Sequence, residues 1–212
     1  CQAGGPADPA LLRALQPLPE TAAEVQAVGR DLGAAPDDIL MGAGATEPAL
    51  RAKALDQYAV LYFATHGMLP GELHCSAQPG LVLSPPATAN ATNADGLLTA
   101  SEIASLKINA NLVVLSACNT GAGGGKSFGG GALQGLADAF FNAGAHAVLA
   151  SHWEVPSAAT MALMTGTFSN MAADPKHDAA EALRKAQLAL IAKGDTAHPF
   201  EWAAFTLIGD GA

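Results

Sequence analysis

Charged and aromatic residues are scarce in this sequence. Of its 212 residues, 14% are charged and 5% are aromatic, whereas 50% are hydrophobic, and alanine carries much of that half. Ten Lys and Arg face 19 Asp and Glu, which gives a formal charge of −9 at pH 7. Because phosphate affinity comes from clustered basic side chains, we expect no nucleic-acid partner. The length suits a single domain with its own core.

Cysteines are equally few, at positions 1, 75 and 118, and no C-x-x-C pair occurs. This excludes a disulfide framework and a four-ligand zinc site as organising features. The longest apolar runs, such as residues 143–150, fall far below the roughly 20 residues of a membrane-spanning helix, so no span is expected. With Cys1 in place of an initiator Met, we expect a fragment boundary, with a processed terminus as the alternative.

Short apolar runs alternate with amphipathic stretches, the pattern typical of α/β proteins. This order predicts a mostly parallel sheet with helices on both faces. The expected strands are 39–41, 58–64, 80–84, 112–117, 145–151 and 202–208, and the expected helices are 21–32, 46–54, 99–106, about 131–142, 158–171 and 178–192. Thr46 and Thr99 are candidate N-caps, the latter in a capping box with Glu102.

Two of the apolar strands end in reactive side chains, His66 and Cys118. In parallel sheets the functional crevice lies beyond the carboxyl ends of the strands, so these side chains should meet. An imidazole that takes the thiol proton makes cysteine a nucleophile. Gly67 and residues 119–121 could offer backbone N–H groups to an oxyanion. The alternative interpretation is a structural Cys beside an ordinary loop His.

Two other chemistries fit the sequence less well. Residues 120–127, TGAGGGKS, nearly form a phosphate-binding loop, but Thr120 occupies the first required glycine position. His and Cys residues could bind a metal, yet none are paired at i, i+4 spacing, and His74 and Cys75 fall in a polar excursion. We therefore expect no cofactor and no metal, and we expect the glycine-rich segment 121–131 to be mobile.

Residues 62–67 (YFATHG) and 112–121 (LVVLSACNTG) resemble the CHAT domain, a caspase-like peptidase module often found beside tetratricopeptide repeats and related to separases. Similarity continues through residues 95–103 and 135–144. As in the caspase signature, Ala precedes the Cys and a His lies about 50 residues upstream; here His66 precedes Cys118 by 52 residues. The resemblance covers residues 18–212 and leaves residues 1–17 as an extension.

The resemblance implies a caspase-like three-layer α/β sandwich and a cysteine endopeptidase that makes limited cuts in a protein or peptide substrate. Cys118 would be the nucleophile and His66 the general base, with the amides of Gly67 and Cys118 as the oxyanion hole and Trp153 and Glu154 binding substrate. It also suggests a bacterial, cytoplasmic protein and a tetratricopeptide-repeat region or partner. The alternative is a non-catalytic module that docks on such repeats.

Two departures from the family pattern concern specificity. Pro156 and Ser157 stand where acidic residues are common, which leaves Glu154 as the one acid of that stretch, and residues 129–131 lack a Glu that often precedes the next helix. If Glu154 enters the S1 pocket, it would select Arg or Lys through charge-assisted hydrogen bonds. An exposed loop position for Glu154 is the equally weighted alternative.

Overall fold

A computed structural model describes residues 6–72, 77–86, 94–116, 130–153, 155–176 and 178–210. Cys1, Cys75, Cys118 and Glu154 lie outside these ranges, as does most of the glycine-rich segment that was expected to be mobile. The described ranges contain the strands, the helices and His66.

The central sheet has the order β1 (Val60–Phe63), β5 (Leu112–Leu115), β6 (Ala147–Ser151) and β7 (Phe205–Gly209). β1, β5 and β6 run parallel, with Phe63 beside Leu115 and Leu115 beside Ala150, and β7 is antiparallel to β6. Every residue of β5 and β6 is buried, because the sheet is covered on both faces. The mostly parallel sheet predicted from the sequence is therefore confirmed.

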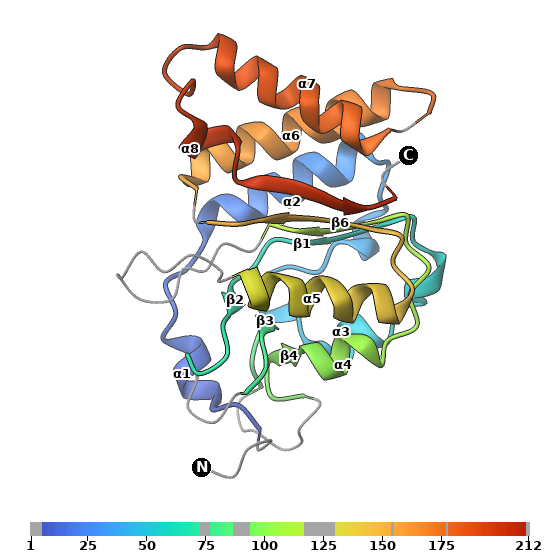
Figure 1. The fold of residues 1–212 in the computed structure, drawn as a ribbon. Helices are drawn as coiled ribbons and strands as arrows, with labels where there is room; N and C mark the ends of the chain where they lie inside the picture. The colour runs from blue at the N-terminus through green and yellow to red at the C-terminus, as the bar shows by residue number, and fades with distance from the viewer. Residues whose placement is uncertain are drawn as a thin grey trace.

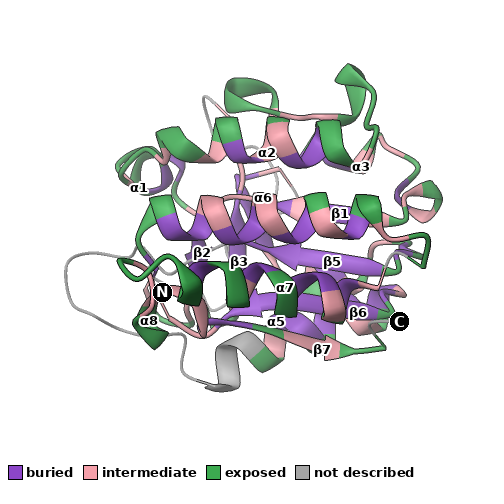
Figure 2. Ribbon diagram, turned by 90° about the horizontal axis from the view of Figure 1, so that it is seen from above, coloured by how far each residue is buried: buried purple, intermediate pink, exposed green. Residues whose placement is uncertain are grey.

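Helices form a layer on each face of this sheet, as Figure 1 shows. One layer contains α2 (Pro19–Asp31), α6 (Ser157–Ala173), α7 (Ala179–Ala192) and the short α8 (Pro199–Trp202); the other contains α3 (Glu47–Arg51), α4 (Ala100–Ala104) and α5 (Gly130–Ala143). Successive residues of β5 face opposite layers, so Leu112 and Val114 join the core under α6 whereas Val113 and Leu115 join the core under α5. Figure 2 looks through the layer of α2, α6 and α7, whose outward faces carry exposed residues, onto the buried strands beneath it.

A second, antiparallel sheet lies beside the α5 layer. It consists of β2 (Gly67–Met68), β3 (Gly80–Val82) and β4 (Leu97–Thr99). The amino-terminal helix α1 (Pro9–Arg13) packs on it, with Leu12 in a small core beside Met68 and Val82. Because β2 begins immediately after His66, this sheet fixes the part of the chain that follows the histidine.

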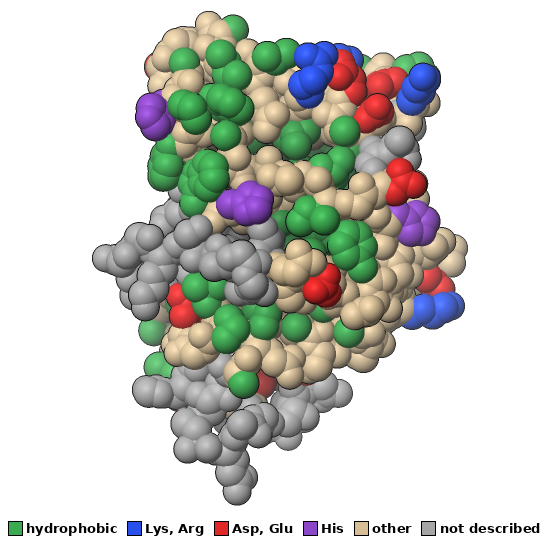
Figure 3. Space-filling model, viewed as in Figure 1, with side chains coloured by type: hydrophobic (Ala, Val, Ile, Leu, Met, Phe, Trp, Pro, Cys, Tyr) green, Lys and Arg blue, Asp and Glu red, His purple; other side chains and the backbone are tan. Residues whose placement is uncertain are grey.

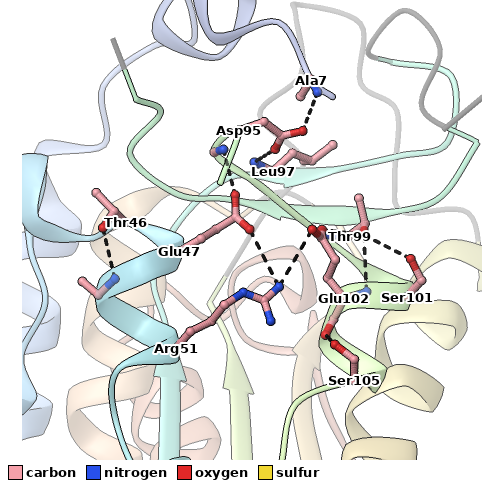
Figure 4. Close-up of polar contacts among 12 residues, drawn as sticks. Ala7, Thr46, Glu47, Arg51, Asp95, Leu97, Thr99, Ser101, Glu102 and Ser105 are labelled. Carbon is pink, nitrogen blue, oxygen red and sulfur yellow. Dashed lines mark hydrogen bonds and ion pairs between the residues drawn. The ribbon is translucent and has the colours of Figure 1, made fainter. Parts of the chain in front are cut away.

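Polar contacts join the second sheet to α3 and α4, as Figure 4 shows. Glu47 is 1% exposed and accepts the Gly96 N–H at 2.8 Å, while its other oxygen lies 3.9 Å from Arg51. Asp95 accepts the backbone N–H groups of Leu97 and Ala7, at 2.8 and 2.5 Å. These bonds tie the amino-terminal segment, the second sheet and α3 into one unit.

Both expected N-caps are confirmed. The Thr46 hydroxyl accepts the Ala49 N–H at 3.3 Å, and Thr99 and Glu102 form a reciprocal capping box at the start of α4. The strand expected at 39–41 was wrong. Those residues run between two 3-10 turns, Pro36–Asp38 and Gly42–Gly44, and the Ile39 side chain fills the space above Gly29 of α2. Because they do not pair with β1, β1 is an edge strand of the central sheet.

On the face shown in Figure 3, Lys and Arg side chains lie near the margin and among acidic ones. Among the helices in the described ranges, none has the length and apolarity needed to cross a membrane.

Candidate active site

His66 lies three residues beyond the end of β1, at the carboxyl edge of the central sheet. Its backbone oxygen accepts the Val82 N–H at 2.9 Å, and the preceding Thr65 hydroxyl donates to the Val82 oxygen. Thr65 and His66, in the connection from β1 to β2, are therefore bonded to β3, and the His66 residue as a whole is 8% exposed.

A backbone carbonyl orients the His66 ring. The Nε2 atom lies 2.7 Å from the Gln16 oxygen, in the segment that joins α1 to α2. Since a carbonyl oxygen can only accept, Nε2 carries the hydrogen, and Nδ1 is the basic nitrogen of the neutral ring. Burial lowers the pKa of His66 below its ordinary value, and the Gln16 hydrogen bond opposes this shift only in part. The neutral imidazole is thus favoured.

The neighbouring strand leads toward the other member of the expected pair. β5 runs parallel to β1 and is followed by Ser116, which is 6% exposed. Cys118 comes two residues later and lies outside the described part of the chain, as does its amide in the expected oxyanion hole. Gly67, the other expected oxyanion residue, is buried in β2 opposite Leu81. The sheet therefore places His66, Gly67 and the end of β5 at one edge.

Of the two expected substrate-binding residues, the described ranges contain Trp153 but not Glu154. Trp153 follows β6, and its indole N–H donates to the Phe200 oxygen at 3.0 Å. The two rings stack with centroids 6.4 Å apart and an interplanar angle of 21°, and Phe200 is 46% exposed. Because β6 is parallel to β5, this aromatic pair lies at the same carboxyl edge as His66.

A buried acid near this edge was not predicted. Glu24 of α2 is 3% exposed, accepts the Tyr62 hydroxyl hydrogen at 2.5 Å and also interacts with the Ser116 side chain. Burial raises the pKa of Glu24, and the two hydroxyl groups oppose the shift. The signal in the sequence was an acid four residues before Val28, on the apolar face of a helix.

A cavity of about 770 Å³ borders the histidine. It lies along the free edge of β1, between α2 and the chain that precedes the strand, and its lining includes Gln16, Val25, Thr65 and His66. The buried imidazole therefore adjoins open space. As for metals, no group of three or more His, Cys, Asp or Glu within the described ranges has a suitable arrangement.

The arrangement defines a class of chemistry before any relative is considered. An oriented, neutral imidazole at the carboxyl edge of a parallel sheet can take a proton from a nucleophile on the neighbouring strand. Comparison with known families agrees with that architecture: the CHAT domain family model matches residues 4–210. The chain therefore belongs to the CHAT domain family, and its α/β fold is caspase-like.

A curated relative carries the same kind of sequence within a much longer protein. Tetratricopeptide repeat protein 28 of Mus musculus is 35% identical over 113 residues. The match covers 53% of this chain but only 4% of the mouse protein. The similarity thus concerns a small part of that relative.

Proposed function

We propose that this chain is a cysteine endopeptidase in which Cys118 is the nucleophile and His66 the general base. The observation that carries the proposal is the His66 ring itself, buried at the sheet edge with Nε2 bonded to Gln16 at 2.7 Å. That bond selects the tautomer whose Nδ1 can accept a thiol proton. The adjacent parallel strand leads into Cys118 two residues after Ser116.

The reaction would proceed as acyl transfer in two halves. Nδ1 of His66 takes the proton of the Cys118 thiol as Sγ attacks the peptide carbonyl carbon, and the amides of Gly67 and Cys118 stabilise the resulting oxyanion. The imidazolium then gives its proton to the leaving amine, and the C–N bond breaks. Water, deprotonated by the same imidazole, attacks the thioester and releases the acid product together with the free thiol.

The lowered pKa of His66 is consistent with this role. A base must be unprotonated before it can act, and burial disfavours the imidazolium in the resting protein. The charge that appears on the ring during attack is compensated by the developing negative charge on the sulfur and oxygen. The Gln16 carbonyl, which accepts the Nε2 hydrogen, stabilises the charged ring further.

Substrate selection is proposed to involve Trp153 and Glu154, in limited cleavage of a protein or peptide. The Trp153 ring, held by Phe200, gives the crevice a rigid aromatic wall. A Glu154 carboxylate in the S1 pocket would favour Arg or Lys at P1. Peptides that differ only at P1 test this: faster turnover after Arg than after Met supports it, and equal turnover refutes it.

A second candidate function is a non-catalytic module that docks on helical repeats. The similarity to a mouse protein named for tetratricopeptide repeats favours a region or partner of that type. Such a partner could equally regulate a peptidase, so the repeat association alone does not separate the two functions. For either function, the proposed location of the protein is the cytoplasm.

Labelling with iodoacetamide at pH 6 separates the two functions. A positioned general base accelerates a reaction by roughly 10²–10⁴-fold. An ordinary thiol at this pH is almost fully protonated and therefore reacts slowly. Cys75 of the same chain serves as the internal standard in a mass-spectrometric readout. The peptidase predicts that Cys118 is labelled at least about tenfold faster than Cys75, and that His66→Ala removes the difference. Equal rates in the unaltered protein favour the docking module.

A further inference from the structure

Glu24 is a carboxylate in the layer between α2 and the central sheet, and its two polar partners come from two different strands. Tyr62 of β1 donates to Glu24 Oε1 at 2.5 Å, and the Ser116 side chain, directly after β5, interacts with the carboxyl group and lowers its pKa. The Glu24 residue is 3% exposed and Ser116 is 6% exposed. The contact is therefore inside the protein and shielded from water.

Packing alone does not account for an acid at this position. Neighbouring side chains in the same core, such as Val28 and Val114, are apolar. Desolvating a carboxylate is unfavourable, and hydrogen bonds compensate for that only when every partner is in place. A leucine of similar volume would avoid the desolvation altogether.

The two partners occupy informative positions along their strands. Tyr62 stands four residues before His66, and Ser116 stands two residues before Cys118. Tyr62 is paired with Val114, so the two hydroxyl groups approach the carboxylate from adjacent strands near the carboxyl edge of the sheet. The Tyr62 ring is itself fixed by an edge-on contact with Phe168 of α6, at 5.5 Å between centroids. One acid thus joins the two segments that lead to the histidine and to the cysteine.

We propose that Glu24 is a positioning residue, whose hydrogen bond to Tyr62 and interaction with Ser116 fix the ends of β1 and β5 at the spacing that the His66–Cys118 pair requires. This inference rests on the proposed peptidase function. It assigns Glu24 no contact with substrate and no part in proton transfer. The ladder between β1 and β5 ends with the pairing of Phe63 and Leu115, so Ser116 is the first residue of its segment that the ladder does not hold.

The test compares four variants of the whole chain. Glu24→Gln keeps an oxygen that accepts from Tyr62 and a polar group that faces Ser116, whereas Glu24→Leu removes both interactions at a similar side-chain volume. Ser116→Ala removes one hydroxyl. Thr167→Val is the matched control, because Thr167 is 1% exposed and its hydroxyl donates only to the Leu163 oxygen of its own helix, α6, at 2.7 Å.

Three readouts are measured for each variant: kcat and KM on a fluorogenic peptide, the rate of iodoacetamide labelling of Cys118, and Tm. Misplacement of a reacting pair by about 1 Å lowers the rate by about 10²-fold. We expect Glu24→Leu to lower kcat by about that factor with KM unchanged and to slow Cys118 labelling in parallel. Ser116→Ala should show a smaller loss of the same kind. Glu24→Gln should retain most of the activity, and Thr167→Val should change Tm alone.

The outcomes are distinct. If Glu24→Leu and Ser116→Ala keep the labelling rate and kcat of the unaltered protein, the positioning role is refuted, whatever happens to Tm. If Glu24→Leu does not fold, Ser116→Ala decides by the same readouts. If Cys118 of the unaltered protein is labelled no faster than Cys75, the His66–Cys118 pair itself is refuted, which is failure of the proposed function.

Discussion

Replacement of Gly144 by alanine should destabilise the protein through one identifiable contact. Gly144 follows α5 and precedes β6, with a backbone φ of +110°. A Cβ at this position would lie 2.1 Å from the backbone oxygen of Ile108. Neither side can move easily, because the Ile108 N–H donates to the Ala143 oxygen at 2.9 Å and the Ala145 N–H donates to the Phe140 oxygen at 2.9 Å.

Gly194 provides a matched control for the backbone conformation. It also follows a helix, α7, with φ +81°, but a Cβ there would meet no atom within 4 Å. A left-handed conformation costs an L-residue about 1–2 kcal/mol, and the reduced entropy of the unfolded chain offsets about 0.4–1 kcal/mol of this. Gly194→Ala should therefore lower the free energy of unfolding by about 1 kcal/mol. Gly144→Ala adds the overlap with Ile108, typically about 1–3 kcal/mol for overpacking.

Thermal and urea unfolding of the two variants check this difference. For a domain of this size, each kcal/mol changes Tm by about 2–4 °C. We expect Gly194→Ala to lower Tm by about 2–4 °C and Gly144→Ala by about 4–16 °C. Equal changes in Tm for the two variants would refute the reasoning, since the positive φ would then account for the whole effect and the contact with Ile108 for none of it.

Three further predictions concern titration and capping. Burial raises the pKa of Glu47, so the contribution of this residue to stability is present at low pH and is lost as the pH rises through the pKa of the folded state. In urea titrations, Glu47→Gln should therefore gain stability relative to the unaltered protein as the pH rises from 4.5 to 7. A difference in stability that stays constant over this range would contradict this. Burial lowers the pKa of His66, so the acidic limb of the kcat/KM profile should have its midpoint below about 6.5, and a midpoint above that value would count against His66 as the base. Thr99→Ala removes the capping box with Glu102 and should lower the free energy of unfolding by about 1 kcal/mol, measured by urea unfolding against Ser105→Ala at the other end of α4.

The elements with strong patterns were predictable from the sequence. The long apolar run before His66 and the run before Cys118 could only be buried parallel strands, and both are neighbours in the sheet. The second sheet was missed except for β3, because strands of two or three residues have too little periodicity to recognise. Residues 39–41 have the composition of a strand, but packing of Ile39 on Gly29 prevailed over that preference.

Of the candidate site, the position of His66 at the edge of the sheet was predictable from the sequence, and its supporting contacts were not. His66 was recognised because it follows a buried strand and precedes Gly67. The Gln16 carbonyl that orients its ring lies 50 residues earlier in a linker, and no sequence pattern specifies which backbone carbonyl a fold will bring to a histidine. In the sequence Glu24 is one more residue of the expected helix 21–32, since a single acid on an apolar face is apparent only once the helix is known to be buried.

Cleavage of quenched fluorogenic peptides by the unaltered chain and by Cys118→Ala tests the central claim most directly. We predict that the unaltered protein hydrolyses at least one peptide of a set that varies at P1, and that Cys118→Ala abolishes hydrolysis while Tm stays the same. Hydrolysis by Cys118→Ala at the rate of the unaltered protein would contradict the account, because the nucleophile would then lie elsewhere.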